Sequence, residues 1–150
     1  MIQRIQSLWL FLAALLSGLM MINWYTGWVY SADIRRGFET IVQRLTVTEH
    51  FPSLIIAVVM ALLPLIAIFM FRDRKRQRMM SIVSILAAIA FIGVNLMRIN
   101  NFNETTAPTP QNGSYMAGSV IPVAVIVFLI LAIRGINKDE KLIKSMDRLR

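Results

Sequence analysis

The sequence predicts an all-α membrane protein, in which four transmembrane helices pack as a bundle. Four long apolar blocks, at residues 8–29, 53–71, 79–97 and 115–133, contain no charged side chain. Each block is close to the ~20 helical residues that cross a hydrocarbon core of ~30 Å. The 150-residue chain is also 57% hydrophobic, which is more apolar surface than a soluble domain of this size buries. We therefore expect one integral membrane domain over residues 1–150.

The first block has a second interpretation, because Arg4 followed by an apolar stretch resembles a secretory signal peptide. The stretch is longer than the apolar core of most signal peptides. Tyr30 would also occupy a cleavage position that requires a small residue. Trp24 and Trp28 near the end of the block are typical of a membrane interface. We therefore expect residues 8–29 to be an uncleaved span.

The connection between the first two blocks carries apolar residues at helical spacing. Ile34, Phe38, Ile41 and Leu45 recur at i, i+4, i+7 and i+11, with charged and polar residues between them. This period is that of an amphipathic helix. We expect a short helix lying on the outer membrane surface. It would either close the gap between two spans or offer a docking face to a partner.

The second connection is short and strongly basic. Its simplest role would be to fix the topology and to attract anionic lipid headgroups. RNA or another acidic partner is not favoured, because no aromatic residue is interleaved with the basic residues to stack on bases. The residues that we expect to contact anionic lipid or a partner here are Arg72, Arg74, Lys75, Arg76 and Arg78.

Three polar residues at or near the spans are candidates for contacts, namely Asn23, Asn95 and Arg98. Asn95 and Arg98 lie one helical turn apart near the outer end of the third block. We expect Asn95 to bond to a neighbouring helix and the long side chain of Arg98 to reach the interface. A contact with a ligand or a lipid headgroup is the alternative.

The C-terminal tail, residues 134–150, is predicted to form a separate cytoplasmic amphipathic helix. Asn137 can cap this helix, and Glu140 three residues later completes a capping-box pattern. We expect the helix to lie on the inner membrane surface or to dock on a partner. The residues available for that contact are Lys138, Lys141, Leu142, Lys144, Met146, Arg148 and Leu149.

The distribution of basic residues predicts the orientation. Twelve of the sixteen lie before the first block, in the second connection or in the tail, and the other four lie in the first and third connections. Positively charged connections stay in the cytoplasm. Both termini are therefore expected to be cytoplasmic.

Several activities are excluded by the residues that the chain lacks. It has no cysteine, which excludes disulfides and thiolate ligands, and its single His50 excludes a bis-histidine haem within one chain. No Asp or Glu lies within a block, so proton-coupled export and acid-dependent catalysis at membrane depth are not expected. We expect no catalytic, cofactor-binding or metal-binding residue and no enzyme activity.

The two ends of the chain resemble a known family. The start, Met1-Ile2-Gln3-Arg4-Ile5-Gln6, and the end, Lys138-Asp139-Glu140-Lys141-Leu142-Ile143-Lys144-Ser145, are similar to domain of unknown function family 4293, a group of small four-span bacterial membrane proteins. The resemblance covers the whole chain and implies a bacterial inner-membrane location. It implies no activity, cofactor or catalytic residue.

The expected function is that of a non-catalytic accessory or scaffolding subunit of a larger inner-membrane complex. One alternative is a small transporter or lipid-handling protein that works as an oligomer, with a path near the intramembrane polar residues. Another is a membrane-bound regulator that acts through its basic tail. The expected partners are anionic lipid headgroups and either another membrane protein or further copies of the chain. Nucleic acid is not expected.

Overall fold

The computed structural model describes the chain except residues 1, 23–24, 37, 72, 108 and 148–150, and it describes only the backbone of residues 2–4, 25, 36 and 143–147. The described part forms the helices α1 (Ile2–Leu19), α2 (Phe51–Phe69), α3 (Arg74–Thr105) and α4 (Ala117–Asp147). It also forms a short 3-10 helix, η1 (Tyr25–Gly27), and the strands β1 (Trp28–Arg36), β2 (Glu39–Thr46) and β3 (Gln111–Tyr115). The prediction of an all-α protein is therefore wrong.

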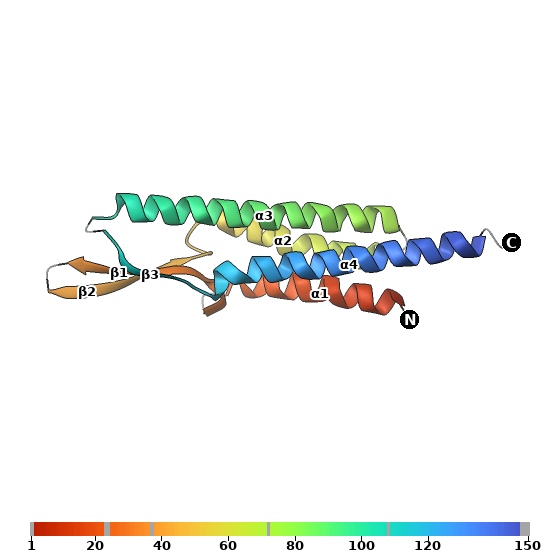
Figure 1. The fold of residues 1–150 in the computed structure, drawn as a ribbon, viewed down its shortest axis with the longest axis horizontal. Helices are drawn as coiled ribbons and strands as arrows, with labels where there is room; N and C mark the ends of the chain where they lie inside the picture. The colour runs from red at the N-terminus through yellow and green to blue at the C-terminus, as the bar shows by residue number, and fades with distance from the viewer. Residues whose placement is uncertain (1, 23–24, 37, 72, 108, 148–150) are drawn as a thin grey trace.

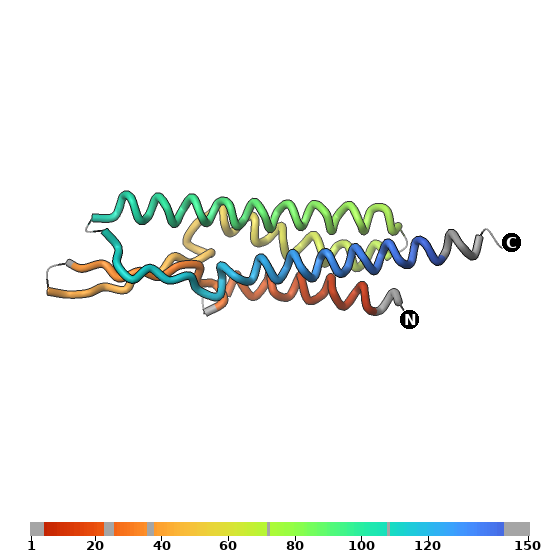
Figure 2. The backbone as a smooth tube through the Cα atoms, viewed as in Figure 1, coloured from red at the N-terminus to blue at the C-terminus, as the bar shows by residue number. Residues whose placement is uncertain are grey.

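The four helices lie side by side, and each runs antiparallel to the next one along the chain (Figure 1, Figure 2). α1 packs on α2 and α4, and α3 packs on the same two helices. At one end, which we call the basic end, α1 begins, α2 turns into α3, and α4 ends. At the other end, the sheet end, the strands are hydrogen-bonded in the order β2–β1–β3.

Three helices of the described chain are long and apolar enough to cross a membrane, namely α2, α3 and the Ala117–Leu142 part of α4. The chain is membrane-associated by this length and composition. The prediction of four spans is wrong, because the apolar part of α1 covers only Ile5–Leu19. The predicted first span, residues 8–29, leaves the helix at Leu19 and ends inside β1. Aromatic and β-branched residues follow this point, and they favour a strand once partner strands are present.

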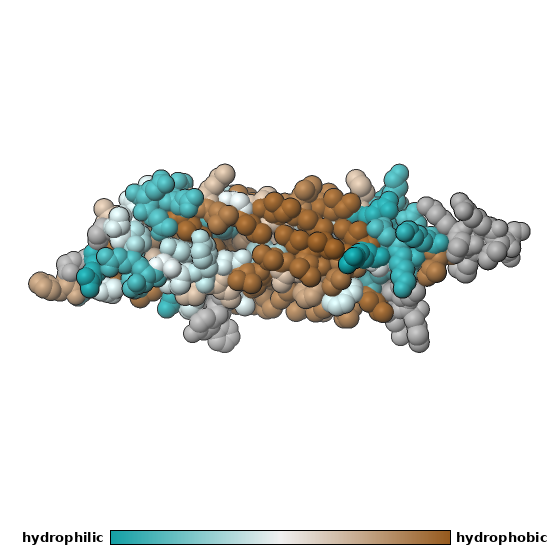
Figure 3. Space-filling model, in the orientation of Figure 1, coloured by the Kyte–Doolittle hydropathy of each residue, from teal (hydrophilic) through white to brown (hydrophobic). Residues whose placement is uncertain are grey.

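The helices expose apolar side chains around a narrow interior. On the face drawn in Figure 3, an apolar band covers the middle of the helices and polar residues gather toward both ends. Only 28% of each spanning window is buried inside the protein. Leu10, Met60, Phe91 and Leu129 fill the interior. Helices that are apolar on their inner and outer faces are suited to a lipid environment.

The segment predicted as an outer amphipathic helix is a β-hairpin. β1 and β2 pair antiparallel from Trp28 opposite Thr46 to Arg36 opposite Glu39. Ile34 lies directly opposite Ile41, so residues expected to share one helix face meet across two strands. Only residues 37–38 separate the paired ends.

Tyr30, in β1, joins the sheet to α3. Its ring lies edge-on to Phe102 of α3 and to Tyr115 of β3, at centroid distances of 6.3 and 5.6 Å. Its hydroxyl donates to Asn103 Oδ1 at 3.3 Å. The ring also requires glycine at position 113 of β3, where a Cβ would lie 1.9 Å from the hydroxyl oxygen. The last turns of α3 thus support the sheet from one side.

The predicted separate tail helix is instead the continuation of α4, which runs without a break from Ala117 to Asp147. Asn137 does not begin a helix, and its Oδ1 accepts a hydrogen bond from Arg78 Nη1 at 3.2 Å. Gly135 does not interrupt α4 either. A Cβ at that position would lie 2.7 Å from Gln6 Cγ, so this glycine allows α1 to approach α4 closely.

Candidate functional site

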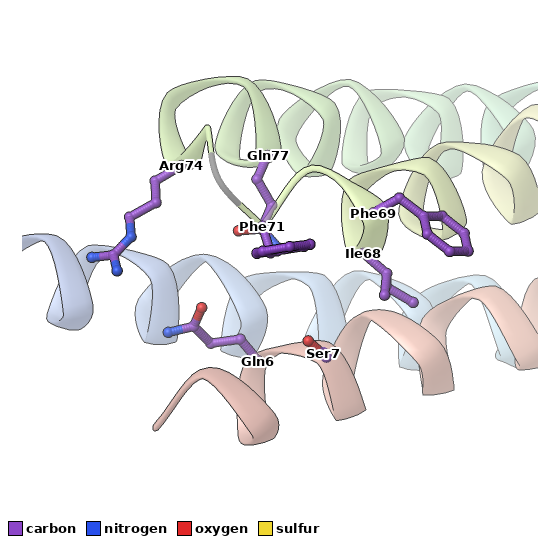
Figure 4. A pocket seen from close by; sticks show the side chains of 7 residues that line it. All are labelled: Gln6, Ser7, Ile68, Phe69, Phe71, Arg74 and Gln77. Carbon is purple, nitrogen blue, oxygen red and sulfur yellow. The ribbon is translucent and has the colours of Figure 1, made fainter. Parts of the chain in front are cut away.

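A pocket of about 480 Å³ opens at the basic end, between α1, the end of α2 and the start of α3 (Figure 4). One wall is apolar and the other is polar. The apolar wall is formed by Ile68, Phe69 and Phe71, and the polar wall by Gln6, Ser7, Arg74 and Gln77.

The polar wall contains buried hydrogen-bonding groups. Gln6 and Gln77 are only 4% and 3% exposed. Arg74 Nη1 is buried and has no hydrogen-bond partner among the residues that the structure describes. A buried donor without a partner costs about 1–3 kcal/mol of desolvation, and a charged one costs more. The unpartnered atom is Nη1 alone, whereas the side chain of Arg74 as a whole is partly exposed and lines the pocket.

Hydrogen bonds between helices hold this end together. Gln6 Nε2 of α1 donates to Asp139 Oδ2 of α4 at 2.5 Å, and Asp139 is only 7% exposed. Arg78 Nη1 of α3 donates to Asn137 Oδ1 at 3.2 Å and to Glu140 Oε2 at 3.3 Å. The start of α3 and the beginning of α1 are thus both bonded to α4, which fixes the shape of the pocket.

Asp73 caps α3 at the edge of the pocket. Its Oδ1 accepts a hydrogen bond from the Arg76 backbone N–H at 3.2 Å, and its Oδ2 lies 2.9 Å from Arg76 Nε. This ion pair is largely exposed and contributes little to stability. Lys75 and Arg76 face outward, so among the described basic residues of this connection Arg74 is the one that lines the pocket.

The other predicted contact residues are not gathered in one place. Lys138, Lys141 and Leu142 are exposed on α4 beyond the apolar band. Asn23 and Arg72, and the side chains of Lys144, Met146, Arg148 and Leu149, lie outside the described residues. No group of three or more His, Asp or Glu side chains within the described part could hold a metal ion.

Asn95 belongs to a small polar cluster near the sheet end. Its Oδ1 accepts a hydrogen bond from Ser53 Oγ of α2 at 3.3 Å. His50 caps α2, because its Nδ1 accepts from the Ser53 backbone N–H, and it lies 2.8 Å from Ser53 Oγ. Burial, followed by the positive charge of Arg98, lowers the pKa of His50 below its ordinary value of 6.5. Ser53 is fully buried, so the cluster caps α2 and joins it to α3.

Arg98 does reach beyond its helix, toward the sheet. Its Nη1 donates to the Thr46 carbonyl at the end of β2, at 2.7 Å. This bond ties α3 to β2, just as Tyr30 ties α3 to β1.

A groove of about 440 Å³ is lined mainly by residues of β2, together with Trp28 and Ile34 of β1. Arg44 lies over the Trp28 ring, 4.1 Å from its centroid, in a cation–π contact. Ile41 and Val42 are about half exposed, and Phe38 beside the turn is fully exposed. Within the described sheet, β2 pairs only with β1, so its other edge has no partner strand, and the Thr46 carbonyl at its end is bonded to Arg98.

Sequence reasoning missed three residues of the basic end, namely Gln6, Gln77 and Asp139. Gln6 lies only two residues after Arg4 and precedes the apolar run of α1. The structure places this polar side chain on the face of α1 that packs against α4. Asp139 lies in the segment that the sequence predicts to form a separate amphipathic helix. Gly135 was the available sequence signal for a close helix contact, since an isolated glycine inside a helix often has a packing reason.

One of three comparisons with known proteins gave a match, and it agrees with the resemblance of the two chain ends. Neither the curated proteins nor the solved structures gave a match to this chain. Residues 2–149 match the family described as domain of unknown function (DUF4293). The match covers nearly the whole chain, and the protein belongs to the DUF4293 family.

Proposed function

We propose that this protein is a non-catalytic accessory subunit that sits in a membrane and binds an extended segment of a partner protein along β2. The observation that carries the proposal is the free edge of β2 at the sheet end. An unpaired strand edge is a template for another strand, and main-chain hydrogen bonds then supply affinity. The groove lined by β2 and by Trp28 and Ile34 of β1 offers room for side chains of such a segment.

β2 suits this role better than β3, which is the other outer strand of the sheet. β2 is eight residues long and exposes Ile41 and Val42. β3 is five residues long, with the sequence Gln-Asn-Gly-Ser-Tyr, and contains Asn112 at a φ of 52°. A short edge with a left-handed residue is a poor template. The groove has Arg44 and Glu49 among its lining residues, so a partner segment of mixed charge fits it better than a strongly acidic or basic one.

We also propose that the protein lies in the inner membrane of a bacterium, with the basic end in the cytoplasm. The positive-inside rule supports this orientation, because the described residues Arg74, Lys75, Arg76 and Arg78 all lie at that end. α1 begins and α4 ends there as well (Figure 1), which supports cytoplasmic termini. The sheet, and the partner segment that it binds, would then be on the outer side.

Site-specific crosslinking in native membranes tests the docking proposal. A photo-crosslinking amino acid at Val42 is expected to give one adduct of defined mass, whose crosslinked peptide is an extended segment of another protein. The same amino acid at Leu86, which is exposed in the apolar band, is expected to give no such protein adduct.

A matched pair of lysine substitutions shows whether the edge itself matters. With the crosslinker at Val42, Thr40→Lys on β2 is expected to abolish the adduct, because charged residues on an edge strand oppose strand addition. Ser114→Lys on β3 adds the same charge to the other outer strand and is expected to leave the adduct unchanged. The proposal fails if the adduct is a second copy of this chain, if both lysines act alike, or if Val42 gives no adduct.

A further inference from the structure

Arg74 is the basic side chain that lines the basic-end pocket, and one nitrogen of its guanidinium lacks a hydrogen-bond partner among the described residues. Arg74 lies at the first turn of α3 and lines a pocket of about 480 Å³. Its Nη1 is buried without a hydrogen-bond partner among the described residues. Arginine is always charged and presents a planar set of donors that matches phosphate or carboxylate oxygens. An anionic oxygen of a ligand would supply the missing acceptor.

The opposite wall of the pocket restricts which anions fit. Phe69 and Phe71 expose 80% and 55% of their surfaces. Figure 4 shows Phe69 on the side of the pocket away from Arg74, and Phe71 beneath Gln77. Exposed aromatic rings in the same pocket as a partly exposed cation suit a ligand that is both apolar and anionic. A small free anion would satisfy Arg74 and leave this apolar wall uncovered.

The position of the pocket agrees with this chemistry. Ile68 and Phe69 belong to the end of α2, one of the three spanning helices. Arg74 and Gln77 belong to the polar region that borders the apolar band. A pocket that joins the end of a span to a basic turn lies where the headgroup of a bilayer lipid meets its acyl chains.

We infer that this pocket binds one phospholipid, with the headgroup phosphate on Arg74 and the acyl chains against Ile68, Phe69 and Phe71. The start of α3 adds the positive end of a helix dipole to the same site. The binding site is independent of the docking of a partner on β2, which lies at the other end of the helices.

Acidic side chains near the pocket do not compete for Arg74. Asp139 Oδ2 accepts its hydrogen bond from Gln6 Nε2. Glu140 bonds to Arg78, and Asp73 bonds to Arg76 and to the Arg76 backbone. Each of these described carboxylates thus has a partner other than Arg74.

Native mass spectrometry of the full chain in detergent, with phosphatidylglycerol or phosphatidylcholine added, tests the inference. One phosphatidylglycerol is expected to remain bound. Arg74→Gln is expected to weaken its binding about tenfold, as the loss of a charge-assisted hydrogen bond implies. Lys75→Gln is the matched control, because it removes the same charge from the next, exposed residue. This variant is expected to change binding less than twofold.

Arg74→Lys keeps the charge without the planar donor set, and it serves if the glutamine variant does not fold. It is expected to bind phosphatidylglycerol with intermediate affinity. The inference is overturned if Lys75→Gln weakens binding as much as Arg74→Gln, since general charge attraction then explains it. It is also overturned if Arg74→Lys binds like the unsubstituted chain, or if excess inorganic phosphate displaces the lipid, which would identify a soluble phosphate compound as the ligand.

Discussion

The two ends of the protein connect the four helices in different ways. At the basic end, α2 and α3 are joined by a short turn, and polar side chains such as Gln6 and Arg78 bond helix to helix. At the sheet end, the two longer connections pair with each other, so that β1 lies between β2 and β3. The comparison teaches that a short basic connection can be recognised from its own charges. A sheet that forms from segments far apart in the sequence leaves little signal in any one of those segments.

The largest effect is expected at the sheet end, from Gly118→Ala. A Cβ on Gly118 would lie 2.6 Å from the Trp28 carbonyl oxygen and 2.9 Å from that of Thr26. Both atoms belong to the backbone, so α4 would move away from β1, at a cost of about 2–3 kcal/mol. Gly93→Ala, where nothing lies within 4 Å of the added Cβ, is the control and should be neutral or slightly stabilising. Denaturation of both variants in mixed detergent measures the difference, and equal melting would contradict the close packing of α4 on β1.

The next effect is expected at the basic end, from Gln6→Ala. It removes the hydrogen bond to the buried carboxylate of Asp139, and charge-assisted bonds of this kind are worth about 1.5–3 kcal/mol. We expect a loss of about 2 kcal/mol in the same denaturation experiment. Adding Asp139→Asn should restore part of the loss, because the neutral amide is less costly to bury. If the double variant is less stable than Gln6→Ala, the explanation through a buried charge is wrong.

Removing the link between α3 and the hairpin is expected to have a smaller effect. Arg98→Gln loses the bond to the Thr46 carbonyl, for about 1 kcal/mol of stability. Hydrogen exchange of the β2 amides should increase, while that of the α2–α3 turn should not. Faster exchange at both ends would mean that the sheet end and the basic end do not respond separately.

The smallest effect is a pH dependence of the sheet end. The lowered pKa of His50 means that the folded state favours the neutral imidazole, which accepts the bond from the Ser53 N–H. Stability is therefore fully present above the ordinary value of 6.5 and decreases as the pH falls through the lowered pKa. Melting between pH 7.5 and 5 should show this decrease, and His50→Asn, which keeps a capping side chain, should remove it. A decrease that persists in His50→Asn would assign it to another group.

The spans predicted best are the apolar blocks for which the sequence offers no alternative to a helix. α2 lies within two residues of the predicted block at 53–71. The predicted spans at 79–97 and 115–133 lie almost entirely inside α3 and α4, whose polar extensions have no apolar signal. The prediction for residues 20–46 was wrong. Within this segment, Ile34 and Ile41 are seven residues apart, and this spacing fits both two turns of a helix and the register of the hairpin.

The candidate sites were predictable only where a single segment carries them. The basic turn was identified from its charges, although nothing in the sequence singles out Arg74 from Lys75. That distinction depends on the approach of α1, whose Gln6 lies far from residue 74 along the chain. The edge of β2 could not be predicted, because an edge exists only once the pairing of β1 with both of its neighbours is known.

The lengths of α3 and α4 set the height of the protein relative to a bilayer. At about 1.5 Å per residue, each of these helices of 32 and 31 residues is longer than a hydrocarbon core of ~30 Å. Figure 1 shows that α3 extends past the others at the sheet end and α4 at the basic end. The two helices thus extend in opposite directions. In a bilayer, the extension of α3 would set how far the sheet end lies from the lipid, and the extension of α4 would set the same distance for the basic end.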